Sequence, residues 1–141
     1  MRDLHSNIDQ ALTFGPVALT ADATGATVDL LGYEAAAIEL QVGIGGITFT
    51  GVNKIDFVAE HSDNGSAWSQ LVDADVQGKT GMTGGIILSL QTAHAAGAAY
   101  KFGYVGGKRY IRVNPDFSGT HGVATPMAGL ILKGRPSRAV A

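Results

Sequence analysis

The chain of 141 residues contains no cysteine and little charge, and both absences narrow what it can be. Without cysteine it has no disulfide framework, no thiolate zinc site and no cysteine nucleophile, and its redox compartment stays undetermined. Only 16% of its residues are Asp, Glu, Lys or Arg, against about 25% in an average globular domain. The net charge is −2, so no overall positive field draws it to nucleic acid. We therefore expect no direct nucleic-acid partner.

Long apolar runs are also missing. No stretch approaches the roughly 18 apolar residues that a membrane-spanning helix needs, so we expect no membrane partner. The first six residues hold no apolar segment of the signal-peptide kind, and we expect synthesis in the cytoplasm without secretion. A chain of this length buries about 68–70% of its unfolded surface and folds without crosslinks. We expect a single domain over residues 1–141.

Glycine is abundant, with 20 residues, and it separates short runs in which apolar and polar residues alternate. In residues 35–42, Ile38, Leu40 and Val42 share one face, and Glu39 and Gln41 lie on the other. Short strands at this spacing predict an all-β antiparallel sandwich or barrel. The candidate strands are 17–20, 26–31, 35–42, 54–61, 67–72, 86–90, 99–105, 109–114 and 126–133.

The two ends and two internal segments give further expectations. Residues 1–13 are polar and predict a flexible arm, either extended or with a short helical turn, and residues 134–141 predict an exposed tail. The alanine-rich stretch 91–98 is the one place for a short helix. Asn64-Gly65 predicts a hairpin. A two-residue turn sets His61 opposite Trp68, and a longer loop shifts that pairing by one residue.

Residues 100–113 are the most informative stretch, because two strand-like runs flank Gly106-Gly107. Both central positions of a two-residue hairpin turn need positive φ, which glycine adopts freely, so a hairpin is predicted here. Its register places Lys101 opposite Arg112. One face collects the large apolar residues and is predicted to enter the core: Tyr100, Phe102, Tyr104, Ile111 and Val113. The other face is a predicted basic strip: Lys101, Lys108 and Arg112.

Like charges directly opposite each other on a sheet are unfavourable unless an anion lies nearby. The simpler explanation is that Lys101 and Arg112 diverge into water, or that an acid on a neighbouring strand pairs with them. The functional hypothesis is a salt-bridged contact with an acidic partner surface. The strip is too small for nucleic acid.

Patterns that carry catalysis fail one by one. The glycine run 43–46 lacks the third glycine and the following helix of a dinucleotide-binding loop. The four histidines are not spaced as metal ligands, and Asp73-Ala74-Asp75 lacks the remaining positions of a calcium loop. We expect no enzyme activity, no catalytic residue, no metal and no cofactor. Trp68, Tyr100 and Tyr104 offer a possible sugar-stacking platform, but large side chains of a sandwich more often form its core.

Three segments carry a resemblance to a known family: Phe57-Val58-Ala59-Glu60-His61-Ser62-Asp63-Asn64-Gly65-Ser66-Ala67-Trp68, Tyr104-Val105-Gly106-Gly107-Lys108-Arg109-Tyr110-Ile111-Arg112-Val113, and Phe117-Ser118-Gly119-Thr120-His121-Gly122. In these the chain resembles the capsid cement, or decoration, protein of tailed phages, of the short-tailed Bordetella phage type. The resemblance implies a jelly-roll-like sandwich of about eight strands. It implies a homo-oligomer, a dimer before a trimer, which sits outside the shell and stabilises the major capsid protein lattice.

These expectations name a partner, a place and a set of contact residues. The partner is the phage major capsid protein, and the place is the exterior of the virion capsid. Polar arms that become ordered on binding are a common way to wrap a neighbour, so residues 1–12 are expected to contact the capsid. The contact residues are expected to be Arg2, Asp3, Leu4, Lys101, Lys108 and Arg112. Two alternatives stay open: a tail-tube or head–tail joining subunit, and a glycan-binding jelly-roll module.

Overall fold

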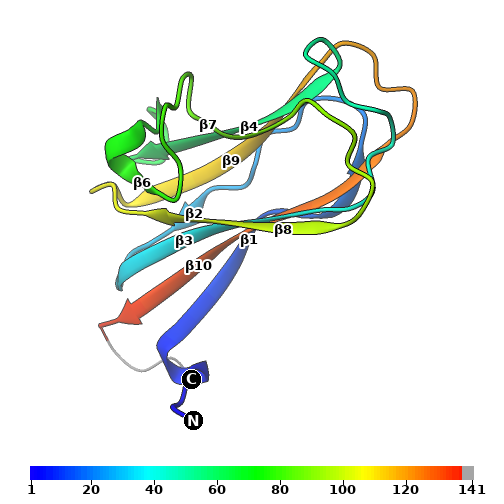
Figure 1. Cartoon of the computed structure of the whole chain (residues 1–141). Helices are drawn as coiled ribbons and strands as arrows, with labels where there is room; N and C mark the ends of the chain where they lie inside the picture. The colour runs from blue at the N-terminus through cyan, green and yellow to red at the C-terminus, as the bar shows by residue number, and fades with distance from the viewer. Residues whose placement is uncertain (138–141) are drawn as a thin grey trace.

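The structure, a computed structural model, describes residues 1–137, and its strands form two antiparallel sheets stacked as a sandwich (Figure 1). Two short 3-10 helices are η1 (His5–Asn7) and η2 (Asp73–Asp75). The strands are β1 (Ile8–Leu19), β2 (Val28–Asp29), β3 (Tyr33–Val42), β4 (Lys54–Ser62), β5 (Ser69–Gln70), β6 (Val76–Gln77), β7 (Ile86–Leu90), β8 (Ala98–Tyr104), β9 (Tyr110–Ser118) and β10 (Thr125–Pro136).

The strand pairs are nested, as in one long hairpin that has been rolled up. β1 pairs with β10, β2 with β9, β3 with β8 and β4 with β7, and residues 63–85 form the far end of the hairpin. Rolling places successive strand pairs alternately in the two sheets. The strand order is β1-β10-β3-β8-β6 in the first sheet and β2-β9-β4-β5 in the second, where β7 also pairs with β4. This is the jelly-roll arrangement, so the predicted fold class is confirmed. The structure has ten strands within residues 1–137 rather than about eight, and of these only β6 lies outside the nine candidate strands.

The predicted hairpin at Gly106-Gly107 is wrong. β8 lies in the first sheet beside β3, and β9 lies in the second sheet beside β4, so this segment crosses between the sheets. Neither glycine has a positive φ. Gly106 is needed for a different reason, since a Cβ there would lie 2.6 Å from the ring of Tyr104. That ring folds back over the loop, and its hydroxyl accepts the N–H of Lys108 at 3.2 Å.

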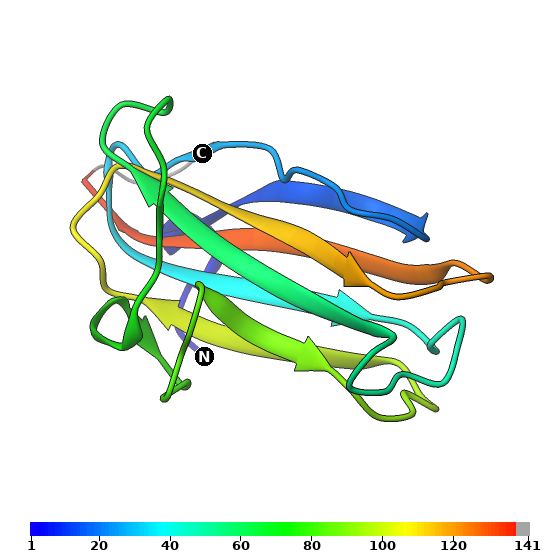
Figure 2. The ribbon, with the colours of Figure 1, turned by 90° about the horizontal axis from the view of Figure 1, so that it is seen from above.

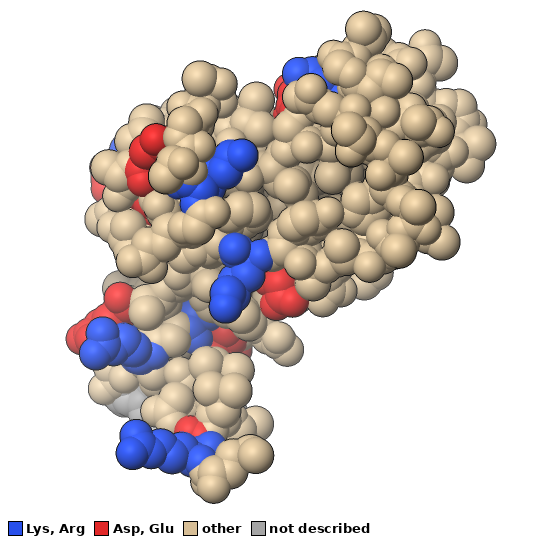
Figure 3. Space-filling view, viewed as in Figure 1, with Lys and Arg blue, Asp and Glu red and all other residues tan. Residues whose placement is uncertain are grey.

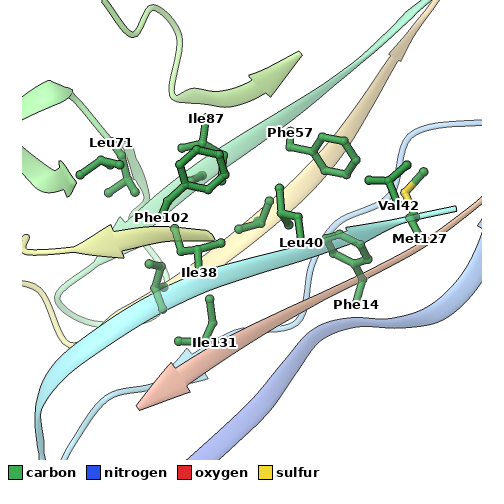
Figure 4. Packing of buried hydrophobic residues seen from close by; sticks show 14 of the residues in the cluster. Phe14, Ile38, Leu40, Val42, Phe57, Leu71, Ile87, Phe102, Met127 and Ile131 are labelled. Carbon is green, nitrogen blue, oxygen red and sulfur yellow. The ribbon is translucent and has the colours of Figure 1, made fainter. Parts of the chain in front are cut away.

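The core face of that stretch is confirmed even though its pairing is not. Phe102, Tyr104, Ile111 and Val113 are buried, and Tyr100 is partly buried. They meet other residues across the sandwich, because alternation directs side chains inward whichever sheet a strand joins. The same apolar layer holds the predicted face of β3, and the rings of Phe14 and Phe57 stack across it at 6.2 Å (Figure 4).

The predicted arm and tail are shorter than expected. Residues 8–13 belong to β1, where Ile8 pairs with Gly134, and β10 continues to Pro136, so residues 134–136 are also in the sheet. A salt bridge of 3.0 Å between Asp9 Oδ2 and Lys133 Nζ also links β1 to β10 at this end. The predicted tail residues 138–141 lie outside the described part of the chain. Only residues 1–7 precede the strand.

The two internal segments differ in outcome. The expected hairpin at Asn64-Gly65 forms with the longer loop, and His61 pairs with Ser69. Gly65 has φ +75°, and the Ser62 hydroxyl accepts the N–H groups of both turn residues. The prediction of a short helix at 91–98 is wrong, because that stretch is a loop followed by the start of β8. Within residues 1–137, no helix is long or apolar enough to cross a bilayer.

One buried contact ties β1 to the second sheet. The Thr13 hydroxyl accepts the backbone N–H of Val113 at 3.1 Å and donates to the Ala26 carbonyl at 3.1 Å. Gly25 lies between them, with its N–H bonded to the Asn114 side chain at 2.8 Å. A Cβ on Gly25 would overlap the Val113 carbonyl, which is backbone and cannot move aside.

We expect Gly25→Ala to lower the free energy of unfolding by about 1–3 kcal/mol, the usual cost of forcing an atom into a filled site. Urea unfolding measures it. Gly122→Ala is the matched control, since a Cβ there meets no atom within 4 Å and should leave stability unchanged. Equal stability of the two variants would show that the close approach of Gly25 to Val113 does not matter for stability.

Candidate functional site

The predicted basic strip does not form. Lys101 lies on the outer face of the first sheet opposite Glu39, and Arg112 lies on the outer face of the second sheet opposite Glu60. The two cations therefore point away from opposite sides of the sandwich, because the strands that carry them belong to different sheets. The prediction that they form one docking strip is wrong.

Neighbouring groups explain why Arg112 and Lys108 need no external anion. Arg112 Nε donates to Glu60 Oε2 at 2.8 Å, and its guanidinium lies 4.1 Å from the centre of the Trp68 ring. Lys108 Nζ lies 3.3 Å from Ser69 Oγ and 4.0 Å from a carboxylate oxygen of Asp63. For Arg112, an acid on the neighbouring strand is thus the explanation that holds.

The three N-terminal residues of the predicted site lie together, away from these cations. Arg2, Asp3 and Leu4 are exposed and come just before η1, beyond the end of β1 (Figure 1). The Asp3 carboxylate accepts the N–H of Ser6 at 3.2 Å, and hydrogen bonding to Ser6 lowers its pKa. The predicted site therefore divides into an N-terminal group, Lys101 on the first sheet, and Lys108 with Arg112, which contact the adjacent residues Ser69 and Trp68.

A different surface emerges where three connections meet at one end of the sandwich. Residues 43–53, 91–97 and 119–124 lie there and contain no Asp, Glu, Lys or Arg. We call these three loops the charge-free end; in Figure 2 they gather at the right. The corresponding part of Figure 3 is almost entirely tan, with one charged spot at the top. Each of two loops offers exposed aliphatic side chains: Ile44 is 64% exposed, Val52 73% and Val123 61%.

Hydrogen bonds hold the three loops against one another. His94 Nδ1 donates to the Gly43 carbonyl at 2.8 Å, and its Nε2 forms a hydrogen bond of 2.9 Å with the Tyr100 hydroxyl. The Gly45 N–H returns to the His94 carbonyl at 2.8 Å. The Asn53 side chain accepts the N–H of Thr120 at 2.9 Å. A carbonyl only accepts, so His94 Nδ1 is the donor in its bond to Gly43.

The ring of His121 packs beneath these loops. It is buried, its Nε2 donates to the Ser118 carbonyl at 2.9 Å, and its ring meets Phe117 edge-on at 4.8 Å. Its Nδ1 has no hydrogen-bond partner within residues 1–137. The ring of Phe49 lies beside the His121 ring, with 6.2 Å between the ring centroids. The loops are therefore packed from below and present their aliphatic tips outward.

A shallow apolar groove of about 630 Å³ continues this surface across the first sheet. It crosses β1, β10, β3 and β8 and reaches the charge-free end at Gly43 and Gly97. Pro16, Val17 and Pro126 line it, and none of its lining residues is charged. Sequence reasoning missed this surface. The signal was present as four long intervals without charge, 10–21, 40–53, 80–100 and 117–132.

The opposite end of the sandwich is charged. A pocket of about 650 Å³ lies beside Gly106-Gly107, between residues 30–36 and 104–109, and Glu34 and Arg135 also line it. Arg109 donates two hydrogen bonds of 2.8 Å to Asp29, and these lower the pKa of Asp29 to about 2. The two ends of the molecule thus differ in chemistry.

The titratable groups that meet in the interior serve structure. His61 Nδ1 lies 2.9 Å from the Tyr104 hydroxyl, and its Nε2 lies 4.0 Å from Asp75. The carboxylate of the exposed Asp73 accepts the backbone N–H groups of Gly81 and Met82, so this side chain closes the turn. Within residues 1–137, no three His, Asp or Glu side chains are arranged to hold a metal ion.

The three aromatic residues considered for sugar stacking are largely occupied. Arg112 covers a face of Trp68, Tyr104 is buried, and Tyr100 is partly buried and bonded to His94. This arrangement offers no specific support for glycan binding.

Comparison with known proteins adds little. No family model matches the chain, and no curated protein sequence matches it. A solved structure from the work "Bacillus endospore appendages form a novel family of disulfide-linked pili" is similar, with 16% identity over 93% of this chain and 90% of that one. Its TM-score is 0.39, which is too low to bear on function.

His61 gives a test of the interior cluster. Burial lowers its pKa, and Lys108 adds to this, whereas Asp75 and Asp63 oppose it. A folded-state pKa below the ordinary value of about 6.5 means that the unfolded chain takes up the proton first. We therefore expect stability to fall as the pH drops below about 6.5, by at most about 1.4 kcal/mol per pH unit for one proton.

Urea unfolding at several pH values between neutral and mildly acidic measures this slope. His61→Gln removes the titrating ring, so its stability should depend less on pH even if it is lower throughout. Equal slopes for the two proteins would assign the pH dependence to other groups.

Proposed function

We propose that the protein is a structural, non-enzymatic component of a phage particle, a cement or decoration protein. In this proposal it binds the outside of the major capsid protein lattice and stabilises the shell. Three sequence segments that resemble such proteins support the proposal, and so does the jelly-roll fold that the resemblance implies. A fold alone does not specify a function, so a specific surface must carry the proposed contact with the shell.

The charge-free end and its adjoining groove carry the proposal. Soluble proteins seldom present contiguous apolar surface unless something docks on it. Here Ile44, Val52 and Val123 stand on connected loops, and the uncharged groove extends the same surface over four strands. Hydrogen bonds fix the loops beforehand, so docking costs little ordering. A modest contact suffices when it is repeated over a lattice of linked sites.

We expect Ile44→Lys combined with Val52→Lys to lower occupancy on capsid shells at least about tenfold, equivalent to about 1.4 kcal/mol. A lysine in the centre of an apolar contact must lose its hydration without gaining a partner. The assay is co-sedimentation with undecorated shells assembled from the major capsid protein of the same genome.

The matched control is Leu31→Lys combined with Val105→Lys. These residues are 67% and 54% exposed and lie at the charged end, beside the Gly106-Gly107 pocket. They should leave occupancy unchanged. Equal loss in both double variants would remove the charge-free end from the proposal. Failure of the unaltered protein to bind shells, or a genome without a major capsid gene, would contradict the function itself.

The N-terminal residues give a second test. Deleting residues 1–7 leaves the ladder from Ile8 to Gly134 complete, so the melting temperature should not change. Occupancy should fall, because residues 1–7 lie beyond the end of β1 (Figure 1) and include the exposed Arg2 and Leu4. Deleting residues 1–12 should also lower the melting temperature, since it removes the partners of residues 130–134. Full occupancy without residues 1–7 would exclude them from the contact.

A further inference from the structure

Half of one edge strand has backbone groups that nothing in the described chain satisfies. β1 is the edge of the first sheet, and its pairing with β10 is regular over residues 8–12. In an antiparallel ladder every second residue directs its N–H and C=O away from the neighbouring strand. Within residues 1–137, no other segment pairs with that side of residues 8–12. We call this side the open edge.

The rest of β1 is protected in the ways that edge strands usually are. The register shifts between Leu12 and Phe14 and again between Phe14 and Val17, and Pro16 removes an N–H donor. The Thr13 carbonyl is taken by the N–H of Ala26. Protection therefore begins where the open edge stops.

The open edge lacks these devices. It has no proline and no register shift, and its one charge, Asp9, is held by Lys133 at 3.0 Å and by the Tyr33 hydroxyl at 3.1 Å. Leu12 is 52% exposed. In Figure 1 this half of β1, with the end of β10, extends past the second sheet, so its edge is accessible. An accessible, regular and unprotected edge is a template for another strand.

We infer that the open edge takes up an extended segment of the capsid protein as an added strand of the first sheet. The inference rests on the proposed function and specifies how the partner is held. Only a polypeptide backbone offers donors and acceptors at the repeat of a strand. The segment would pair over about five residues, with apolar side chains beside Ile8 and Leu12.

The capsid protein fits this edge better than a second copy does. Antiparallel pairing of two such edges centres on Gln10 and brings the Asp9 carboxylates of both copies to diagonal positions on one face. The open edge also lies on the same strand as Pro16 and Val17 of the apolar groove, although at the end of β1 that is nearer to Gly106-Gly107. A single partner can therefore cover the edge and the groove together.

Proline substitution separates the open edge from the ladder. Of two adjacent residues, one directs its N–H to β10 and the other to the open edge, so Gln10→Pro and Ala11→Pro are compared. The variant that breaks the ladder should lose thermal stability. The other should keep the wild-type melting temperature and lose shell occupancy at least about tenfold, because it lacks the N–H for the added strand. Wild-type occupancy of the stable variant would overturn the inference.

Hydrogen exchange of the wild-type protein supplies a readout that needs no variant. Alternate amides within residues 8–12 should exchange rapidly in the free protein and at least about tenfold more slowly on shells. Unchanged exchange on fully occupied shells would overturn the inference and leave the proposed function standing. Protection of the same amides in a free dimer would overturn it in favour of a second copy. Absence of shell binding would overturn both proposals.

Discussion

The structure depends on one apolar layer buried between two sheets. β3 contributes Ile38, Leu40 and Val42 to it, and β4 contributes Ile55 and Phe57 from the opposite side, all almost fully buried. Each such side chain contributes about 1.5–3 kcal/mol when it leaves water. Because the nested strand pairs alternate between the sheets, the layer can close only if the connections cross from one sheet to the other. The layer therefore decides where the loops lie.

Those connections collect at two ends with unlike chemistry. At one end, Arg109 and Asp29 pair beside a pocket that holds further charges. At the other, His94, His121 and backbone groups fix loops that contain no Asp, Glu, Lys or Arg, and aliphatic tips face outward. A protein that must bind a large surface in one orientation benefits from this difference, because only one end gains by losing contact with water. The open half of β1 lies on the sheet that carries the groove.

Alternation in the sequence was sufficient to predict strands, the sandwich and the buried face of residues 100–113. It failed at Gly106-Gly107, because local sequence does not reveal whether two successive strands share a sheet. Gly106 is needed for another reason, since a Cβ there would lie too close to the ring of Tyr104. That error produced the basic strip, since Lys101 and Arg112 are neighbours only in a hairpin. The arm and tail were misjudged because pairing of residues 8–12 with 130–134 is non-local. The charge-free end was readable as intervals without charge, but only the topology brings them together.

The orientation of the protein on a particle is the most direct test of this account. A cryo-electron microscopy reconstruction of decorated shells would place each end relative to the major capsid protein. The account predicts that residues 43–53 and 119–124 and the groove contact the shell, with an added strand along residues 8–12. Density in which neither the groove nor residues 8–12 contact the shell, or shells without this protein, would contradict it.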